Sequence, residues 1–242
     1  MRPEPSPGTD GSQLAAAAAP PDLMLLLIRH AEQATMRIAD ADLSERGVVQ
    51  ASLLAERLAA LPPTAVVSSP LRRARQTAEI VARRCRLQPE VEPGLEEYRL
   101  TPEARERRYT HSPARAMEPD PGDYAASALA GVRVIPRTGR WLTMDGVESI
   151  EAVRARGQAA IDRAVARHPG GVVACISHGG LINAVVGSWL GVVDDMWFVP
   201  WHTGISAVLL RADRRILLTL NDAAHLGGDQ DMLGLVAGHV RG

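Results

Sequence analysis

The chain carries two kinds of hydrophobic pattern, and they predict different elements. Short unbroken apolar runs are typical of parallel strands that are buried on both faces. Such runs predict strands over residues 23–29, 64–68 and 172–177. Two short runs near the C-terminus, in which apolar residues alternate with others, predict an antiparallel hairpin formed by residues 204–211 and 214–220. Residues 87–95 contain two prolines, which an edge strand tolerates, so a short edge strand is expected there.

Apolar residues that recur every three or four positions predict helices between these strands. The predicted helices cover residues 44–61, 70–84, 147–168 and 179–190. Ser44 suits the N-cap of the first helix, and Pro70 suits the first turn of the second. The apolar face of the first helix is expected to hold Val48, Leu53, Leu54, Leu58 and Leu61. Strands that alternate with helices in this way predict an α/β fold with a parallel sheet.

The two ends of the chain and one central stretch lack a regular pattern. We expect a disordered tail over residues 1–22, a folded domain over residues 23–226 and a loose tail over residues 227–242. Residues 96–146 are rich in proline, glycine and arginine, which predicts a lid-like insertion with one or two short helices. The alanines of the first tail resemble a weak signal sequence, but the stronger apolar run, residues 23–28, ends in Arg29 and His30, so cleavage there would remove these candidate site residues.

Composition limits the classes of function that fit. The 242 residues, 46% of them hydrophobic, suit one large domain better than two small ones. The formal net charge is −1, so no overall field attracts nucleic acid or a membrane surface, and no apolar stretch is long enough to span a bilayer. Cys85 and Cys175 form neither a disulfide framework nor a metal motif, which is typical of a cytoplasmic protein with reduced thiols.

Two histidines follow predicted buried strands that are far apart in the sequence. His30 comes directly after the first strand, beside Arg29, and His178 follows residues 172–177 and precedes two glycines. A third strand end, within residues 68–78, leads into an arginine-rich helix start. Open parallel sheets bind ligands at the carboxyl ends of their strands. Because a neutral imidazole can attack phosphorus and arginines can hold the oxygens around it, the pattern predicts phosphoryl chemistry.

Six short motifs occur in order along the chain. They are Arg29-His30-Ala31-Glu32, L-S-E-R-G-V-V-Q-A from Leu43 to Ala51, S-P-L-R-R-A-R-Q-T-A from Ser69 to Ala78, Leu95-Glu96-Glu97, Asp145-Gly146-Val147-Glu148-Ser149 and Ser177-His178-Gly179-Gly180. Together they resemble the histidine phosphatase superfamily, the phosphoglycerate mutase-like branch 1. The resemblance runs over residues 23–226, with a poor stretch at 99–145, and it implies a three-layer α/β/α fold with a mostly parallel central sheet.

The resemblance also implies a role for each matched side chain. His30 would be the nucleophile that forms a phosphohistidine, and Glu97 would give a proton to the leaving oxygen. Arg29, Arg73 and His178 would hold the phosphoryl group. Arg73 is selected over its neighbour because it directly precedes the alanine of its motif.

Some assignments have alternatives in the sequence. Glu96 is the alternative to Glu97 as the acid.

Other residues near these motifs also need an interpretation. The first backbone N–H groups of the helix that starts at Gly179 are available to an anion. Glu106 lies in an E-R-R-Y sequence similar to a phosphoglycerate mutase motif, and we interpret it as an exposed charge. Glu148 suits the first turn of the following helix. Taken singly, a histidine at a strand end is more often a structural residue, and only the combination of motifs favours a site.

The chain departs from the family pattern on the substrate side. Ala31 replaces the usual glycine, and no asparagine follows the first motif, where Gln33 or Arg37 would substitute. His202 stands where the family has a late asparagine. Gln33, Arg37 and His202 are therefore candidate substrate-binding residues, while Glu32 either orients its loop or has no role. No metal or other cofactor is expected, because no histidine shows metal-ligand spacing.

These features predict a metal-independent phosphatase that hydrolyses a small phosphomonoester metabolite through a phosphohistidine intermediate. A phosphoglycerate mutase-type phosphotransferase is the alternative within the superfamily, and a non-catalytic phospholigand-binding protein is the alternative outside the enzymes. The expected partner is a small anionic phosphorylated substrate, with neither nucleic acid nor a membrane involved. The oligomeric state stays open, although the apolar strand edges and Trp197, Phe198 and Trp201 are compatible with a homodimer.

Overall fold

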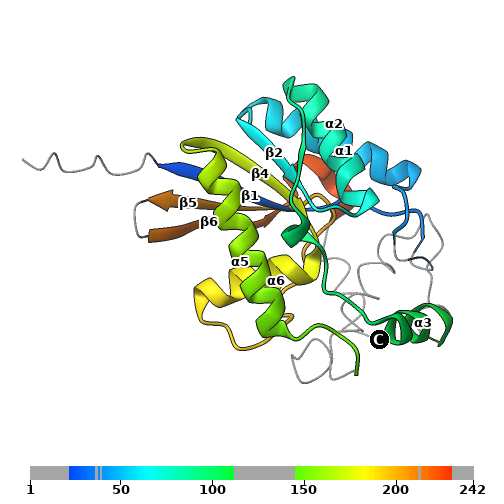
Figure 1. Ribbon diagram of the computed structural model, residues 1–242. Coiled ribbons are helices and arrows are strands. Elements are labelled where there is room, and N and C mark those ends of the chain that lie inside the picture. Colours follow the sequence, from blue (N-terminus) through cyan, green and yellow to red (C-terminus); the bar gives the residue numbers. More distant parts are fainter. Residues whose placement is uncertain (1–21, 36–37, 39, 112–144, 212–213, 231–242) are drawn as a thin grey trace, which may run out of the picture.

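A mixed sheet of six strands, in the order β3-β2-β4-β1-β5-β6, lies at the centre of the computed structural model (Figure 1). The structure describes residues 22–35, 38, 40–111, 145–211 and 214–230. The strands are β1 (Leu23–Arg29), β2 (Ala65–Ser68), β3 (Glu90–Val91), β4 (Gly171–Ser177), β5 (Ile205–Arg211) and β6 (Arg214–Asp222). Strands β3, β2, β4 and β1 are parallel, whereas β5 is antiparallel to both β1 and β6.

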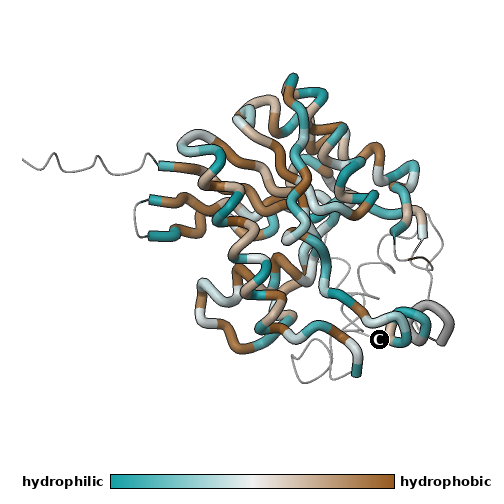
Figure 2. The backbone as a smooth tube through the Cα atoms, in the orientation of Figure 1, coloured by the Kyte–Doolittle hydropathy of each residue, from teal (hydrophilic) through white to brown (hydrophobic). Residues whose placement is uncertain are grey.

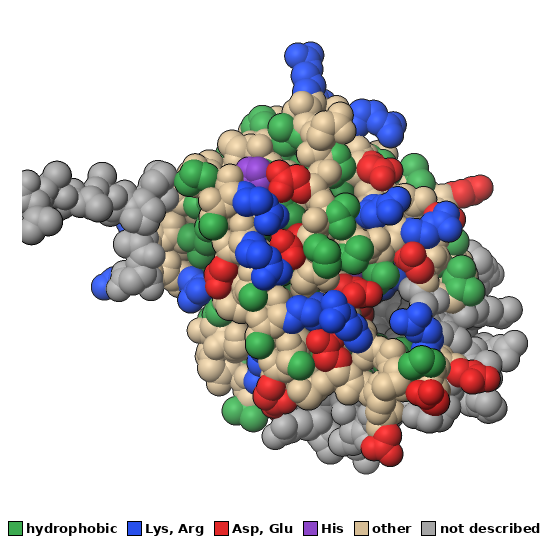
Figure 3. Space-filling model, in the orientation of Figure 1, with side chains coloured by type: hydrophobic (Ala, Val, Ile, Leu, Met, Phe, Trp, Pro, Cys, Tyr) green, Lys and Arg blue, Asp and Glu red, His purple; other side chains and the backbone are tan. Residues whose placement is uncertain are grey.

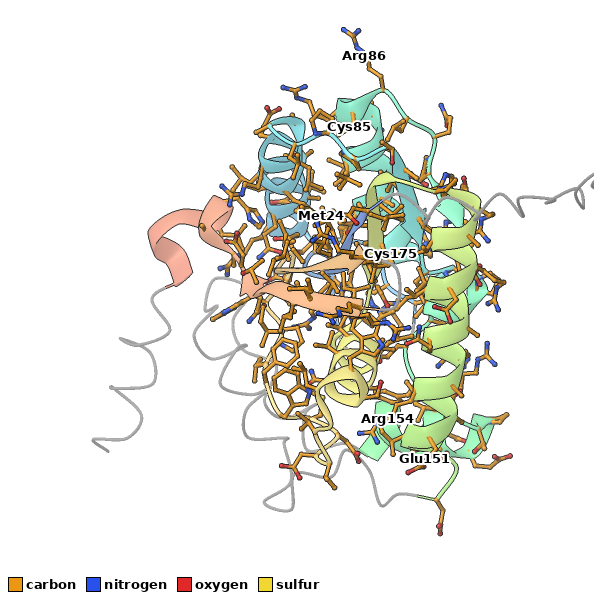
Figure 4. All side chains as sticks on the ribbon, turned by 90° about the vertical axis from the view of Figure 1, so that its left-hand side faces the viewer. Met24, Cys85, Arg86, Glu151, Arg154 and Cys175 are labelled. Carbon is orange, nitrogen blue, oxygen red and sulfur yellow. The ribbon has the colours of Figure 1, made fainter. Side chains whose placement is uncertain are left out.

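Helices cover both faces of this sheet, which confirms the three-layer α/β/α prediction (Figure 1). The α-helices are α1 (Glu45–Ala59), α2 (Arg72–Cys85), α3 (Pro102–His111), α5 (Ile150–Arg167) and α6 (Gly179–Leu190), and the 3-10 helices are η1 (Pro93–Leu95) and η3 (Ala224–Gln230). In Figure 4, Glu151 and Arg154 mark the beginning of α5, and Cys85 and Arg86 mark the end of α2 at the opposite side of the molecule.

Strand β1 shows how the sheet is covered. Leu25 and Leu27 pack in a cluster with α5 and α6, while Leu26 and Ile28 pack in a second cluster with α1 and α2. A strand that is buried on both faces needs an apolar residue at every position, which explains the unbroken run in the sequence. Figure 2 shows the same result as hydrophobic colour along the central strands and hydrophilic colour on the outside.

The buried face of α1 differs from the prediction. Val48, Leu53 and Leu61 are exposed, so their assignment to the apolar face is wrong. The buried positions are Gly47, Gln50, Ala51, Leu54, Ala55 and Leu58. Residues of a helix share a face at spacings of three and four, so a face centred on these positions turns Val48 and Leu53 outwards. Small and polar residues occupy it because α1 approaches other backbone closely, as described below for the site.

Three element boundaries also differ from the prediction. Helix α2 begins two residues after Pro70, with Leu71 as its N-cap. Only Glu90–Val91 forms the predicted edge strand, because Glu92 caps η1 with its side chain and the chain turns there. Helix α5 begins at Ile150 with the side chain of Ser149 accepting from the N–H of Ala152, so Glu148 is not a first-turn carboxylate.

The two ends of the central insertion meet. Leu100 forms an antiparallel bridge with Val147, and the N–H of Thr101 donates to the carbonyl of Gly146. Helix α3 provides one predicted short helix, and Glu106 is exposed on it. Residues 112–144 lie outside the described residues, as do 1–21 and 231–242, so the lid and tail predictions are not tested. The 3-10 helix η3 extends four residues into the predicted C-terminal tail.

The aromatic residues considered for a dimer surface belong to the fold of the protomer. Trp197 and Phe198 pack against the cluster formed with α5 and α6, and Trp201 is buried. On the face shown in Figure 3, arginine and acidic side chains are interspersed. Among the helices in the described residues, none has the length and hydrophobicity needed to cross a membrane.

Candidate active site

The parallel register of two neighbouring strands brings the two motif histidines together. Arg29 at the end of β1 pairs with Ser177 at the end of β4, so the next residues, His30 and His178, leave the sheet side by side. The N–H of His30 donates to the carbonyl of Ser177 over 2.8 Å. The two imidazole rings have centroids 5.0 Å apart. The predicted convergence at the carboxyl ends of the strands is therefore present.

Arg73 joins both imidazoles from the third strand end. It lies in the first turn of α2 and is buried, although it is charged. Its Nε donates to Nε2 of His30 over 3.0 Å, and its Nη2 lies 3.2 Å from Nδ1 of His178. One guanidinium thus contacts the two rings on which the proposed chemistry depends.

Hydrogen bonds fix which nitrogen of His30 carries the proton. Nδ1 lies 2.7 Å from the carbonyl oxygen of Ala31, which only accepts, so Nδ1 must be the protonated nitrogen. Nε2 accepts from Arg73, so it carries a lone pair. A neutral imidazole with a lone pair at Nε2 has the form that a nucleophile requires.

The same reasoning assigns the opposite tautomer to His178. Its Nδ1 faces a guanidinium nitrogen of Arg73, which only donates, so Nδ1 carries the lone pair. Its Nε2 therefore holds the proton and donates to Oγ of Ser69 over 2.7 Å. Ser69 follows β2 directly, and sequence reasoning did not assign it a function, although it opens the S-P-L motif.

Burial and nearby positive charge hold the imidazoles neutral. The pKa of His30 lies well below its ordinary value, first because the ring is buried and then because of the Arg73 charge, with smaller effects from His178 and Arg29. The pKa of His178 is lowered well below its ordinary value by burial, and then by Arg73 and Arg29. Arg29, the neighbour of His30 in the sequence, therefore affects the pKa of His30 less than burial and Arg73 do.

Arg29 reaches the site from the last position of β1. Its Nη1 donates to the carbonyl of Pro200 over 2.7 Å, which anchors the guanidinium against the loop that precedes β5. Because β5 is antiparallel to β1 and starts at Ile205, opposite Ile28, that loop lies at the same end of the sheet as the two histidines. Arg29 and Arg73 thus approach His30 from different elements.

The carboxylate of Glu97 lies at the N-terminus of α6, the helix whose N-cap is His178. Its Oε2 accepts from the N–H of Gly180 over 3.3 Å, and its Oε1 accepts from the N–H of Tyr98 over 3.1 Å. A Cβ at position 180 would press on this carboxylate, so the second glycine of S-H-G-G allows the approach. The sequence had suggested that the N–H of Gly180 is available to an anion. In the structure this N–H donates to Glu97 instead. Glu96, the alternative acid, instead pairs with Arg99 over 3.2 Å.

The family model of the histidine phosphatase superfamily (branch 1) matches residues 25–223. The chain belongs to this superfamily. A metal-independent phosphoserine phosphatase of Arabidopsis thaliana is 29% identical over 215 residues, which cover 84% of this chain and 82% of that protein. A probable phosphoglycerate mutase of Photorhabdus laumondii is 30% identical over 177 residues, which cover 70% of this chain and 75% of that protein.

A solved structure of the superfamily shows the same fold. Mycobacterial glucosyl-3-phosphoglycerate phosphatase in complex with inorganic phosphate superposes with a TM-score of 0.63 at 26% identity, covering 84% of this chain and 98% of that one.

Two motif residues of this histidine phosphatase hold the backbone that follows the first histidine. Oγ1 of Thr77 accepts from the N–H of Ala31 over 3.0 Å, and Oε1 of Gln50 accepts from the N–H of Glu32 over 2.9 Å. A side chain at Gly47 would collide with the carbonyl oxygen of Glu32, so α1 can approach the loop only through glycine. These residues position His30, and sequence reasoning assigned them no such role.

Glu32 orients its own loop, which was one of its two predicted roles. Its carboxylate accepts from Oγ of Ser44 over 2.7 Å, and its carbonyl accepts from the N–H of Ser44 over 3.0 Å. Ser44 is also the N-cap of α1, as predicted, and accepts from the N–H of Gly47. The start of α1 is therefore tied to the residues beside His30.

The candidate substrate-binding residues have different surroundings. The Nε2 of Gln33 donates to the carbonyl of Thr35 within its own loop, and Arg37 lies outside the described residues. His202 lies beside His30, with a distance of 5.6 Å between the two ring centroids. Burial, and then the charge of Arg29, lowers the pKa of His202 well below its ordinary value. The structure thus brings His202 next to His30, while the side-chain amide of Gln33 is bound within its own loop.

The backbone that carries His202 is strained. Thr203 has a φ of +59°, which is rare for a β-branched residue and persists only where the surroundings enforce it. Its N–H donates to the carbonyl of Arg29 over 3.0 Å, and its hydroxyl donates to the carbonyl of His202 over 2.7 Å. These bonds fix the turn that places His202 in the site.

His225 supports this turn, and its lowered pKa leads to a prediction for the pH dependence of stability. Its Nε2 donates to Oγ1 of Thr203 over 3.0 Å, and its buried Nδ1 has no hydrogen-bond partner among the described residues. Burial lowers the pKa of His225 to about 4, with Asp222 opposing the shift and Arg57 adding to it. Unfolded histidine takes up a proton below about pH 6.5. Between these values the unfolded state binds more protons, so stability falls as the pH is lowered.

Replacing His225 with glutamine is therefore expected to flatten the acid loss of stability. The free energy of unfolding of the wild type should fall more between pH 7.5 and pH 5.5 than that of His225→Gln, by about 0.5–1 kcal/mol once solvent screening of this partly exposed ring is allowed for. Urea unfolding at the two pH values measures the difference. Equal losses in both proteins would show that the pKa of His225 is not depressed.

Within the described residues, no group of three histidine, cysteine or carboxylate side chains is arranged so as to hold a metal ion.

Proposed function

We propose that the protein is a metal-independent phosphatase that hydrolyses a small phosphomonoester through a phosphohistidine at His30. The observation that carries this proposal is the state of the His30 ring. Its Nδ1–H is fixed by the Ala31 carbonyl, and its Nε2 lone pair lies 3.0 Å from Nε of Arg73. This tautomer is the one that a nucleophile needs, and on substrate binding the Nε–H of Arg73 is proposed to leave the Nε2 lone pair and to bind an oxygen of the phosphoryl group instead.

In the proposed first step, Nε2 of His30 attacks phosphorus in line with the ester oxygen. The N–P bond forms as the P–O bond to the alcohol breaks, and Glu97 gives its proton to the leaving oxygen. In the second step, a water molecule attacks the phosphohistidine, and the Glu97 carboxylate accepts its proton. The N–P bond breaks, inorganic phosphate leaves, and His30 returns to its neutral form with Glu97 protonated again.

Positive and hydrogen-bonding groups around His30 would stabilise the charge that the phosphoryl group carries. Arg29 and Arg73 present guanidinium donors, and the N–H of Gly179 lies at the start of α6, where the helix dipole favours an anion. A doubly negative phosphoryl group raises the pKa of a nearby imidazole, so His178 can gain a proton and donate when substrate is bound. These preorganised charges supply the largest part of the rate enhancement.

The proposed substrate is a small anionic phosphorylated metabolite, such as a sugar phosphate or a phosphoglycerate derivative. The relatives named above include phosphatases of phosphoserine and of glucosyl-3-phosphoglycerate, which supports an alcohol as the leaving group. His202 is proposed to contact the substrate beside the phosphoryl group, and Gln33 and Arg37 stay candidates for the outer part of the site. Both cysteines are free thiols, which supports the proposed cytoplasmic location.

A phosphoglycerate mutase activity is the second candidate, and the mutase among the relatives favours it. A mutase must retain its phosphorylated intermediate, and its motif acid would correspond here to Glu106. That residue is exposed on α3, whereas the carboxylate of Glu97 accepts from the N–H of Gly180 in the first turn of α6, the helix that His178 caps. Hydrolysis is therefore the better-supported outcome.

One experiment separates the two activities. The protein is incubated in the presence of a metal chelator with 3-phosphoglycerate and bisphosphoglycerate, and inorganic phosphate and the 2-phospho isomer are measured together. We expect phosphate release to be faster than isomerisation and unaffected by the chelator. Isomerisation faster than phosphate release would favour the mutase. Absence of phosphate release, even from p-nitrophenyl phosphate, would favour a protein that only binds phosphorylated ligands.

A further inference from the structure

A single arginine of α5 holds the segment that carries the proposed acid. Nη1 of Arg156 donates to the carbonyl of Gly94 over 2.9 Å and to that of Glu96 over 2.8 Å. Its Nη2 donates to the carbonyl of Glu97 over 3.3 Å. The planar guanidinium offers its donors in a fixed geometry, so these three carbonyls are held relative to one another.

The remaining donors of Arg156 bind Glu148. Nε donates to Oε1 over 3.0 Å, and Nη2 donates to Oε2 over 2.7 Å, which is a bidentate pair. Both side chains are largely buried, with exposed fractions of 13% and 14%. All donors of the guanidinium are thereby directed at protein oxygens. Glu148 is the glutamate of the D-G-V-E-S motif, and the proposed phosphatase mechanism gives it no role.

Glu148 holds the backbone on the C-terminal side of Glu97. Its Oε2 accepts from the N–H of Arg99 over 3.0 Å, and its own N–H donates to the carbonyl of Arg99 over 2.9 Å. The backbone from Gly94 to Arg99 is thus held at both ends by one ion pair. Within this stretch, the carboxylate of Glu97 is directed at the N–H of Gly180.

We propose that Arg156, together with Glu148, is a positioning residue that sets the distance of the Glu97 carboxylate from the leaving oxygen. The proposal rests on the role of Glu97 given under the proposed function. Arg156 itself touches no substrate, because its donors are all bound to protein. Proton transfer in the transition state needs the acid within hydrogen-bond reach of the oxygen, and a misplacement of about 1 Å can cost on the order of 100-fold in rate.

A second arginine of the same helix provides a matched control. Arg163 binds the carboxylate of Glu92, which lies just before the segment held by Arg156. In the part of the chain that the structure describes, Arg163 donates to Glu92 and not to the carbonyls of residues 94–97, and its side chain is 54% exposed. Glu92 keeps Arg167 as a partner when Arg163 is removed. Arg163→Gln therefore removes an arginine–glutamate pair of α5 without releasing the backbone that carries Glu97.

The test compares two leaving groups in the full-length protein. p-Nitrophenyl phosphate releases a phenolate that needs little help from an acid, whereas β-glycerophosphate releases an alkoxide that needs a proton. For each variant we measure kcat/KM for both substrates and take the ratio of the β-glycerophosphate value to the p-nitrophenyl phosphate value. A general loss of structure lowers both values, while a misplaced acid lowers the ratio.

We expect Glu97→Gln to lower this ratio by about 100-fold or more. Arg156→Gln is expected to lower it by about 10–100-fold, and Arg156→Lys by less, because lysine keeps the charge but not the planar fork. Arg163→Gln should leave the ratio as in the wild type. If Arg156→Gln does not fold, Arg156→Lys and Glu148→Gln, checked by circular dichroism, answer the same question.

The possible failures are distinct. A ratio that falls in Glu97→Gln but not in the folded variants of Arg156 and Glu148 would overturn the positioning role and leave the acid in place. A ratio unchanged in Glu97→Gln would overturn the acid assignment, and the positioning proposal with it. A ratio that falls equally in Arg163→Gln would show that any disturbance of α5 has this effect, which also overturns the proposal.

Discussion

Replacing His30 with alanine is expected to lower kcat for phosphate release from p-nitrophenyl phosphate by at least about 10⁴-fold. The variant keeps Arg29, Arg73 and His178, which stabilise charge, but it lacks the atom to which the phosphoryl group is transferred. The ring is buried, so its removal leaves a small polar space beside Arg73 rather than a disrupted core. Phosphate release is measured with protein whose circular dichroism matches the wild type.

His168→Ala is the control for this prediction. His168 lies at the C-cap of α5, before the first residue of β4 and thus at the opposite end of that strand from His178. Its Nε2 lies 2.9 Å from a carboxylate oxygen of Glu90, a surface contact that contributes little to stability. We expect turnover as in the wild type. Turnover of His30→Ala that matches that of His168→Ala would refute the nucleophile assignment.

Replacing Arg73 with glutamine is expected to lower kcat/KM by about 10³-fold, because one guanidinium that reaches both imidazoles is lost. Inorganic phosphate is expected to raise the Tm of the wild type, and the same change should abolish this increase. It should also raise the pKa values of His30 and His178, since the Arg73 charge lowers both. The acid limb of the pH–rate profile should therefore move to higher pH.

The neighbouring arginine is a matched control for Arg73→Gln. Arg72 has the same chemistry one position earlier, but its side chain is half exposed and pairs with Asp42. We expect Arg72→Gln to keep kcat/KM and the response to phosphate within about twofold of the wild type. A larger loss in Arg72→Gln than in Arg73→Gln would reverse the assignment made from the alanine that follows Arg73.

Much of the fold could be predicted because the limits of its central strands and of one helix are set by their own residues rather than by distant contacts. The limits of β1 and α6 agree with the sequence pattern, and β4 begins only one residue earlier than predicted. A central strand of a covered parallel sheet is apolar at nearly every position, so its ends are visible where the first charged or polar residue occurs. The four parallel strands then bring the ends of β1, β2 and β4 to one edge.

The pattern failed where close backbone contacts replace hydrophobic burial. The buried face of α1 includes Gly47 and Gln50, because there the helix lies against the backbone of Glu32. A hydrophobic pattern favours Val48 and Leu53 instead, and these are exposed. The information that decides the face is a hydrogen bond to a loop distant in sequence, and periodicity does not contain it.

The candidate site shows the same division. The sequence motifs brought out His30, Arg73 and His178, because these residue types have a recognisable chemistry beside phosphate. The residues that hold them were not predicted as such: Ser69 accepts from His178, and Thr77 fixes the backbone beside His30. Hydroxyl and amide side chains of this kind are common at helix starts and turns, so their long-range partners are known only from the structure.

Trapping of the phosphorylated protein tests the proposed phosphohistidine most directly. The wild type is mixed rapidly with p-nitrophenyl phosphate, quenched under alkaline denaturing conditions that preserve a phosphorus–nitrogen bond, and digested for mass spectrometry. We expect one added phosphoryl group on the peptide that contains His30, formed before steady-state release of phosphate and absent from His30→Ala. A phosphoryl group on any other residue, or turnover with no phosphorylated peptide detected even when Glu97→Gln slows its hydrolysis, would contradict this mechanism.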